Sequence, residues 1–225
     1  MSDRWAVFFD LEGTLVVRAT KLEEVIETVL YAHDRVRSAD AVAHAVARAS
    51  AGDGRPSRAL YAQVFRALAL EDDAERLAAA VWESCQRLDP PVLAPGAPAA
   101  IELLRGAGAV LGVITNADGA VRDLLGRLGL ARSFAVVMTP SRGGATKPDR
   151  RIFEAALVEA HVPAERAWHV GDDPVGDARG ARDAGLSPVL LVGARAGAGA
   201  DGFSTASRVD EAAALILKRQ AEKDA

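Results

Sequence analysis

The sequence predicts an α/β fold: a Rossmann-like parallel sheet with helices on both faces, plus an inserted α-helical cap domain. Two observations lead to this prediction. Short apolar runs alternate with helical patterns through the second half of the chain, and buried strands that alternate with helices form parallel sheets. A purely helical block interrupts this alternation directly after the first apolar run. The 225 residues are enough for a core domain with a smaller inserted one.

The first apolar run, Trp5-Ala-Val-Phe-Phe9, predicts a buried strand, and Gly13 marks its exit turn. The alternation resumes after Pro98. Four further apolar runs predict strands over residues 109–114, 134–138, 167–170 and 188–192. The helical patterns that follow these runs predict helices over residues 121–128, 149–160, 175–184 and 209–218.

The helical block lies between the first strand and Pro90-Pro91, where consecutive prolines end a helix and stiffen a linker. Apolar residues recur in this block at helical spacing, and breaks near Ser38 and Gly52 divide it into about four helices. We therefore expect an α/β core domain of residues 1–16 and 93–225, and a helical cap domain of residues 17–92. An insertion at this point predicts a cap over the carboxyl end of the first strand.

Composition argues against several classes of function. The formal net charge of −4 and the absence of a basic run argue against a nucleic-acid-binding protein. The N-terminus has no signal-peptide pattern, and no apolar stretch approaches the length of a membrane span. We therefore expect a cytoplasmic protein that binds neither nucleic acid nor membrane. The sequence carries no signal for oligomeric state.

Two acidic residues, Asp10 and Glu12, follow the first strand. Ligands of open α/β folds bind beyond the carboxyl ends of the parallel strands, so both carboxylates are expected at such a site. Gathering carboxylates there costs free energy unless a cation or a reaction uses them. An ordinary polar turn is the alternative interpretation of this segment taken alone.

Polar residues also follow the second and third strands. Thr115-Asn116 precedes a helix, where a hydroxyl and free backbone N–H groups form an anion site, although Thr115 also suits an ordinary helix cap. Lys147 lies between a Gly-Gly pair and Pro148, which suits a first helical turn and keeps the lysine extended. Such a lysine can act as a point charge against carboxylate and phosphate. A solvated surface lysine is the alternative.

Three acidic residues, Asp172, Asp173 and Asp177, follow the fourth strand. Mg²⁺ prefers a few carboxylates together with water and phosphate oxygens, so this cluster predicts a magnesium site. The metal interpretation is strongest for Asp172. The alternative is an acidic turn in which Asp173 or Asp177 caps the next helix, and it is strongest for Asp177, because a helical pattern continues after it. His169, on the strand itself, is expected to be a packed core residue.

Together these segments resemble the haloacid dehalogenase-like (HAD) superfamily of phosphohydrolases. The resemblance covers essentially the whole chain, including the helical insertion after the first motif. The matching motifs are Phe-Phe-Asp10-Leu-Glu12-Gly-Thr-Leu, Val-Ile-Thr115-Asn, Lys147-Pro-Asp and Val-Gly-Asp172-Asp173-Pro-Val-Gly-Asp177. The later Gly180-Ala-Arg-Asp-Ala-Gly185 also looks like the usual continuation in this superfamily.

The resemblance implies a Mg²⁺-dependent phosphatase that hydrolyses a small phosphorylated metabolite through an aspartyl-phosphate intermediate. Asp10 would attack the phosphorus, and Glu12 would protonate the leaving oxygen and then activate the hydrolytic water. The residues implied to hold Mg²⁺ are Asp10, Glu12 (through its backbone carbonyl) and Asp172, with Asp173 or Asp177 in support. The residues implied to bind the phosphoryl group are Thr115, Asn116 and Lys147.

Glu12 departs from the family pattern, because the second acid is usually aspartate. The longer side chain moves the carboxyl group by about 1.5 Å. An uncompensated displacement on this scale costs on the order of a hundredfold in rate. Enolase-phosphatases of the same superfamily look similar at this position, so the glutamate is compatible with catalysis, at a lower expected rate.

Three other functions stay open at this stage. Haloacid dehalogenation through an ester on Asp10 needs neither a metal nor a second acid, so Glu12 and Asp172 argue against it. A phosphomutase would pass the phosphoryl group to another acceptor. A weakly active protein that only binds phosphate ligands would keep the same fold. Glu12 is the only residue that supports this third alternative.

The cap is expected to determine the choice of substrate. The loop Gly54-Arg55-Pro56-Ser57-Arg58 carries two arginines, Arg55 and Arg58, that would contact a second anionic group on the substrate. A solvated loop before a helix is an equally well supported alternative. Helical caps of this kind are expected to open to admit substrate and to close to exclude water.

Overall fold

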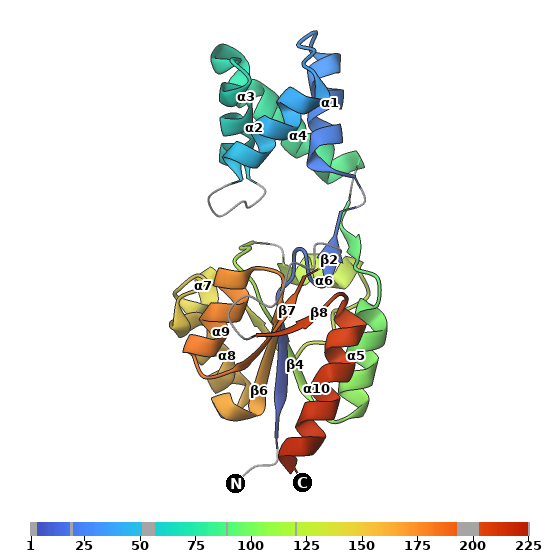
Figure 1. The fold of residues 1–225 in the computed structure, drawn as a ribbon, viewed down its shortest axis with the longest axis vertical. Helices are drawn as coiled ribbons and strands as arrows, with labels where there is room; N and C mark the ends of the chain where they lie inside the picture. The colour runs from blue at the N-terminus through green and yellow to red at the C-terminus, as the bar shows by residue number, and fades with distance from the viewer. Residues whose placement is uncertain are drawn as a thin grey trace. The chain divides into compact units, whose positions relative to one another are not determined.

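The computed structural model describes residues 4–18, 20–50, 57–88, 90–119, 121–192 and 203–224. The chain divides into two compact units (Figure 1). The larger unit comprises Met1–Val17 and Leu93–Ala225, and the smaller one comprises Arg18–Val92. No helix among the described residues combines the length and the apolarity needed to cross a bilayer.

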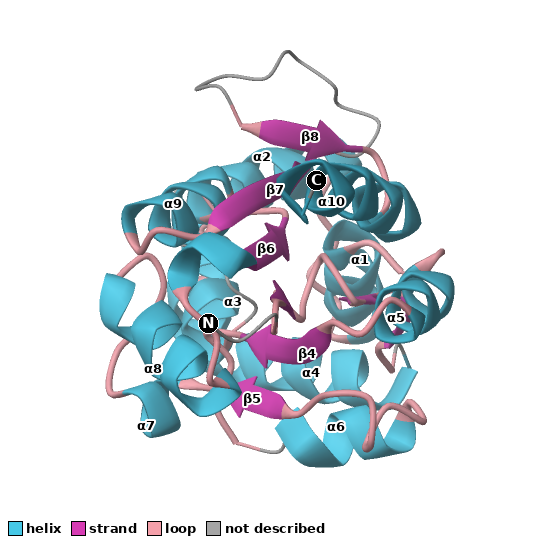
Figure 2. Cartoon of the chain, turned by 90° about the horizontal axis from the view of Figure 1, so that it is seen from below, coloured by secondary structure: helices cyan, strands magenta, loops and turns pink. Residues whose placement is uncertain are grey.

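The larger unit is built on a six-stranded parallel sheet with the strand order β5-β4-β1-β6-β7-β8. Its helices lie on both faces of the sheet (Figure 2). This arrangement confirms the predicted Rossmann-like fold. The strands of this sheet are β1 (Ala6–Phe9), β4 (Val110–Ile114), β5 (Val136–Met138), β6 (Ala167–Gly171), β7 (Ser187–Leu191) and β8 (Ser204–Ala206).

The central strand β1 is buried on both faces, because successive side chains of a strand point to opposite sides of its sheet. Val7 and Phe9 pack in one core cluster, and Ala6 and Phe8 pack in another. The first cluster includes residues of α5 (Ala97–Gly106) and α10 (Val209–Asp224), and the second includes residues of α8 (Arg150–Ala160). Both faces of the sheet are therefore fixed by apolar packing, and the strand ends are left for polar side chains.

Short helices complete the larger unit. They are α6 (Val121–Arg127), α7 (Pro140–Gly143), α9 (Gly180–Asp183) and the 3₁₀-helix η2 (Ala164–Arg166). The predicted helix over residues 175–184 is divided, because it begins as a π-helical segment, η3 (Pro174–Arg179), and continues as α9. π-Helical turns are rare and occur frequently at functional sites.

Sequence periodicity did not reveal several elements of the structure, including α5, β8 and a second small sheet. Helix α5 has Pro98 in its first turn, a position that tolerates proline, so the proline-rich segment looked like a linker only. Strand β8 is a three-residue edge strand, Ser-Thr-Ala, and has no apolar run to mark it. A second, two-stranded sheet pairs β2 (Val16–Val17) with β3 (Val92–Leu93), and these strands are shorter than any pattern can reveal.

The smaller unit contains four α-helices in its described part, in agreement with the predicted number. They are α1 (Leu22–Ala32), α2 (Ala39–Ala49), α3 (Arg58–Ala67) and α4 (Ala74–Leu88), with the 3₁₀-helix η1 (Glu71–Asp73) before the last. Ser38 and Ser57 cap α2 and α3, because each hydroxyl accepts a hydrogen bond from a backbone N–H in the first turn. The helices share an apolar core of their own, centred on Ile26, Phe65 and Leu77.

Gly112 in β4 gives a test of how tightly this core is packed. A Cβ atom there would lie 2.6 Å from a ring carbon of Phe8 on the neighbouring strand. We therefore expect Gly112→Ala to lower the free energy of unfolding by about 1–3 kcal/mol through overpacking, measured by urea denaturation. Gly126→Ala in α6 is the matched control: its Cβ meets open space, and we expect a gain of about 0.5–1 kcal/mol. Equal effects of the two substitutions would contradict this description of the core.

Candidate active site

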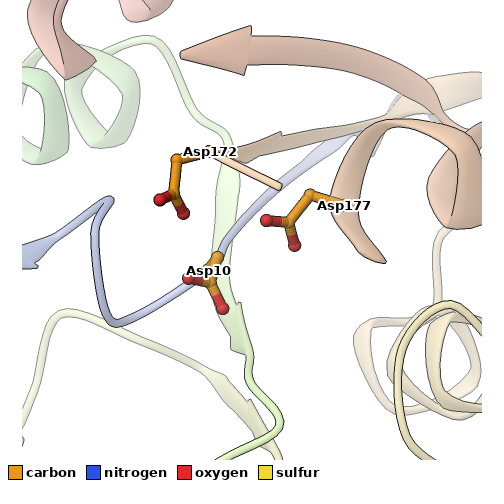
Figure 3. Close-up of side chains that lie close together, drawn as sticks. All are labelled: Asp10, Asp172 and Asp177. Atoms are coloured by element: carbon orange, nitrogen blue, oxygen red, sulfur yellow. The ribbon is translucent and has the colours of Figure 1, made fainter. Parts of the chain in front are cut away.

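Three carboxylates meet at the carboxyl end of the sheet. Asp10 follows β1 and Asp172 follows β6, and these adjacent strands pair Phe9 with Val170. The Asp10 backbone N–H continues the pairing with a 2.8 Å hydrogen bond to the Val170 carbonyl. Asp177 reaches the same point from η3, and an oxygen of each carboxylate lies within 4.8 Å of the others (Figure 3).

The three carboxylates suit a hard divalent cation, because Mg²⁺ and Ca²⁺ prefer oxygen ligands. Two glycines make room for the carboxylates. A Cβ at Gly13 would lie 2.3 Å from Asp172 Oδ2, and a Cβ at Gly171 would lie 2.1 Å from Asp177 Cγ. Gly13 also has a positive φ of 85°, which other residues rarely adopt. The backbone around the cluster is therefore built for close approach of acidic side chains.

Lys147 is buried between two of these carboxylates. Its Nζ donates hydrogen bonds to Asp10 and to Asp177, and its side chain is 5% exposed. Burying a lysine is expensive unless its charge is paired. The lysine therefore neutralises part of the negative charge that the strand ends bring together.

Asn116 holds the backbone of Lys147 in place. Its side-chain amide nitrogen donates to the Lys147 carbonyl at 3.0 Å, and its side-chain oxygen accepts from the Lys147 N–H at 2.7 Å. Asn116 was expected to bind phosphate, but its side chain is hydrogen-bonded to the backbone of Lys147. These two bonds connect the segment after β4 to the segment before α8.

His169 is a site residue whose role the sequence did not reveal. It is buried as expected, but its Nε2 lies 2.8 Å from Asp177 Oδ1, and its ring packs edge-on against Phe153. The backbone N–H of Asp173 donates to the other oxygen of Asp177 at 3.1 Å. The only available signal was the position of His169 two residues before Gly171, close in sequence to Asp172 and Asp177.

The other predicted residues lie as follows. The Thr115 hydroxyl is buried and accepts a 3.1 Å hydrogen bond from the Ala117 N–H; it does not cap the next helix, because α6 begins at Val121. The side chain of Asp173 caps η3 by accepting from Val175 N–H at 2.8 Å. Glu12 is exposed in the turn after β1. Arg58 is exposed at the first turn of α3 in the smaller unit, and Arg55 lies outside the described residues.

Burial shifts the acidities in this cluster. The pKa of Asp10 is raised to about 7, first because burial disfavours its charged form and further because Asp177 is near, although Lys147 opposes the shift. The pKa of Asp172 is raised to about 6 by burial and by the charge of Asp177. This second shift is smaller because the Asp172 side chain is partly open to solvent, whereas Asp10 is buried.

Asp177 behaves in the opposite way. Burial alone would raise its pKa, but the hydrogen bond from His169 and the charge of Lys147 outweigh burial and hold the pKa well below its usual range. Burial lowers the pKa of His169, so its ring is neutral near pH 7. Burial also disfavours the charged form of Lys147, but Asp10 and Asp177 outweigh it and raise the lysine pKa. Asp177 and Lys147 therefore form a fixed ion pair beside a titratable Asp10.

Comparison with known proteins identifies the family. The family model described as haloacid dehalogenase-like hydrolase matches residues 6–185, a stretch that includes every strand-end residue of this site. The chain belongs to this family.

Several curated relatives of this HAD-like hydrolase carry related names. The chain is 35% identical over 131 residues to haloacid dehalogenase-like hydrolase domain-containing protein 3 of Xenopus laevis, a match that covers 57% of this chain and only about half, 54%, of that protein. It is 34% identical over 196 residues to a phosphoglycolate phosphatase of Rhodospirillum rubrum, covering 83% of this chain and 78% of that enzyme. Matches therefore include proteins named as phosphatases.

Solved structures share the fold. A putative β-phosphoglucomutase of Thermotoga maritima aligns with a TM-score of 0.79 at 22% identity, covering 95% of this chain and 99% of that one. A 2-haloacid dehalogenase of Pseudomonas syringae aligns with a TM-score of 0.61 at 26% identity, covering 96% and 99%. These neighbours are named for different activities but share one architecture, so the activity of this HAD-like hydrolase must be argued from its site.

The raised pKa of Asp10 gives a test that needs no substrate. Between roughly pH 4 and 7 the folded protein holds a proton on Asp10 that the unfolded chain has released, so the metal-free protein loses stability as pH rises through this window. Asp10→Asn removes this titration. We therefore expect the difference in unfolding free energy, variant minus wild type, to increase by about 2 kcal/mol as the pH rises from 5.5 to 8. Urea unfolding in EDTA measures this difference.

Asp173→Asn makes the same change on the exposed loop nearby and controls for removal of a carboxylate in general. A stability difference between Asp10→Asn and wild type that stays constant with pH would show that Asp10 titrates normally.

Proposed function

We propose that this HAD-like hydrolase is a Mg²⁺-dependent phosphatase that hydrolyses small phosphate monoesters through an aspartyl-phosphate on Asp10. One observation carries the proposal: a buried carboxylate and a buried lysine are in contact where two further carboxylates converge. Phosphoryl transfer needs a nucleophile placed among positive charges that offset the charge of the phosphoryl oxygens. The relative named phosphoglycolate phosphatase supports the same reaction class.

The proposed reaction has two steps. A carboxylate oxygen of Asp10 attacks the phosphorus, the new oxygen–phosphorus bond forms, and the bond from phosphorus to the alcohol oxygen breaks. Glu12 gives its proton to the departing alkoxide. The Glu12 carboxylate then takes a proton from water, the water oxygen attacks the phosphorus, and the bond to Asp10 breaks to release phosphate. Glu12 ends the cycle protonated, as it began.

The phosphoryl group would be bound by the Thr115 hydroxyl and the Lys147 ammonium group. Lys147 already contacts Asp10, so it is placed to offset the charge of both the nucleophile and the incoming phosphate. Asn116 would act through Lys147, since its side chain is bonded to the lysine backbone.

Mg²⁺ would be held by a carboxylate oxygen of Asp10, the Glu12 backbone carbonyl and Asp172. When bound, the ion supplies positive charge against the nucleophile and the phosphoryl oxygens. Asp177 would support this site without direct ligation, because both of its oxygens already accept hydrogen bonds within the protein. Asp173 is proposed to shape the loop only, since its side chain caps η3.

The direct test is a phosphatase screen over a panel of small phosphate monoesters, with and without Mg²⁺. We expect phosphate release that depends on Mg²⁺ and falls by at least about 10³-fold in Asp10→Asn, because the nucleophile is lost. Glu12→Gln should lose about 10²–10⁴-fold, the usual contribution of a general acid–base group. Release that survives Asp10→Asn would contradict the mechanism, and Mg²⁺-independent chloride release from 2-haloacids would favour a dehalogenase.

Asn116→Ala tests the positioning of Lys147. Removing both bonds to the lysine backbone should lower kcat by about 10–100-fold, because misplacement on the 1 Å scale costs about that much. Asn116→Asp keeps the acceptor for the Lys147 N–H but sets a carboxylate oxygen against the Lys147 carbonyl oxygen, so steady-state kinetics should give it a kcat no higher than that of Asn116→Ala. Full activity in Asn116→Ala would show that the lysine loop is held without this side chain.

A further inference from the structure

A cavity of about 610 Å³ lies at the amino ends of β6, β7 and β8. Trp168 and Ser187, paired in the sheet, and Ser204, the first residue of β8, line it. The catalytic carboxylates follow the carboxyl ends of β1 and β6. Because all six strands are parallel, this cavity is at the opposite edge of the sheet from the proposed phosphatase site.

The cavity carries positive charge in an acidic protein. Its described lining residues include three cations, Arg182, Arg219 and Lys223, and one carboxylate, Glu222, which together carry a net charge of +2. The whole chain has a formal charge of −4. Asp183 forms an ion pair with Arg182 at 3.7 Å and offsets part of the charge of that guanidinium. Arg182 lies in the last turn of α9 and Lys223 in the last turn of α10, so both cations also interact favourably with a helix dipole.

Each of the three cations is held at the cavity by a specific contact. Lys223 Nζ lies 4.6 Å from the centre of the Trp168 ring and 3.3 Å from Ser187 Oγ. The guanidinium of Arg182 lies 4.9 Å from the centre of the Phe203 ring. Arg219 donates to Ser204 Oγ at 2.5 Å. Long cationic side chains normally lose conformational entropy when they bind a ligand. These contacts already restrict the three side chains, so less entropy is lost on binding.

We propose that this cavity binds a small oxyanion, a molecule that carries phosphate or carboxylate groups, at a site separate from the catalytic one. Guanidinium and ammonium groups form strong charge-assisted hydrogen bonds with such oxygens. The Ser187 and Ser204 hydroxyls supply further polar contacts on the same wall. The volume falls within the range of small-molecule sites, about 300–1,000 Å³.

The test is a titration of the full chain with inorganic phosphate, and separately with citrate, at constant ionic strength. The Trp168 indole N–H, which donates to Gln220 beside the cavity, is followed in ¹H–¹⁵N spectra. The indoles of Trp5 and Trp82 serve as internal controls. We expect a saturable shift at Trp168 with at least one anion, and the anion that gives it distinguishes phosphate from carboxylate ligands.

Substitutions then assign the binding. Arg219→Ala and Lys223→Ala should each weaken it about tenfold, the value of one charge-assisted hydrogen bond. Lys218→Ala removes the same charge from an exposed position on the same helix and should leave binding unchanged. Glu222→Gln should tighten binding, because it removes the carboxylate of the cavity. The absence of a saturable shift with either anion, or an equal loss in Lys218→Ala, would overturn the proposal.

Discussion

The contact of the buried Lys147 ammonium group with Asp10 and Asp177 is the interaction on which this site depends. A parallel sheet places polar groups of several strand ends at one edge, and three carboxylates there would repel one another strongly. The lysine allows two of them to be buried almost completely. Without it, each ionised carboxylate would lose its hydration and gain no partner.

The contacts around the lysine arise from different strand ends and reinforce one another. Asn116, after β4, fixes the backbone of Lys147. His169, on β6, binds Asp177 and keeps it ionised. The protein therefore separates two kinds of acid: Asp177 is permanently paired, whereas Asp10 is held near its point of ionisation. A bound cation would stabilise the ionised form of such a carboxylate and so lower its pKa.

The sequence allowed much of the fold to be predicted, because long apolar runs and helical spacing report directly on burial. The strands that carry Asp10, Thr115 and Asp172 were predicted from such runs. Strand β8 and helix α5 were not predicted, since a three-residue polar edge strand and a helix that begins with proline leave no periodic signal. For the site, the types of residue that follow the strands, and the order in which they occur along the chain, pointed to phosphoryl-transfer chemistry.

Pairwise contacts could not be predicted in the same way. Nothing in the spacing indicates that the Asn116 side chain faces the Lys147 backbone, or that His169 and Asp177 share a hydrogen bond, because both contacts depend on side-chain directions set by tertiary packing. The role of Glu12 and the role of the helical cap of residues 17–92 stay predictions, which activity measurements can test.

The central claim is that one divalent cation binds where the first and fourth strand-end motifs converge. Diffraction from crystals soaked with Mn²⁺, collected at a wavelength where manganese scatters anomalously, tests it most directly. The account predicts one strong anomalous peak in contact with carboxylate oxygens of Asp10 and Asp172, with Lys147 still bonded to Asp177. A peak elsewhere on the protein, or an absence of any peak at saturating Mn²⁺, would contradict it.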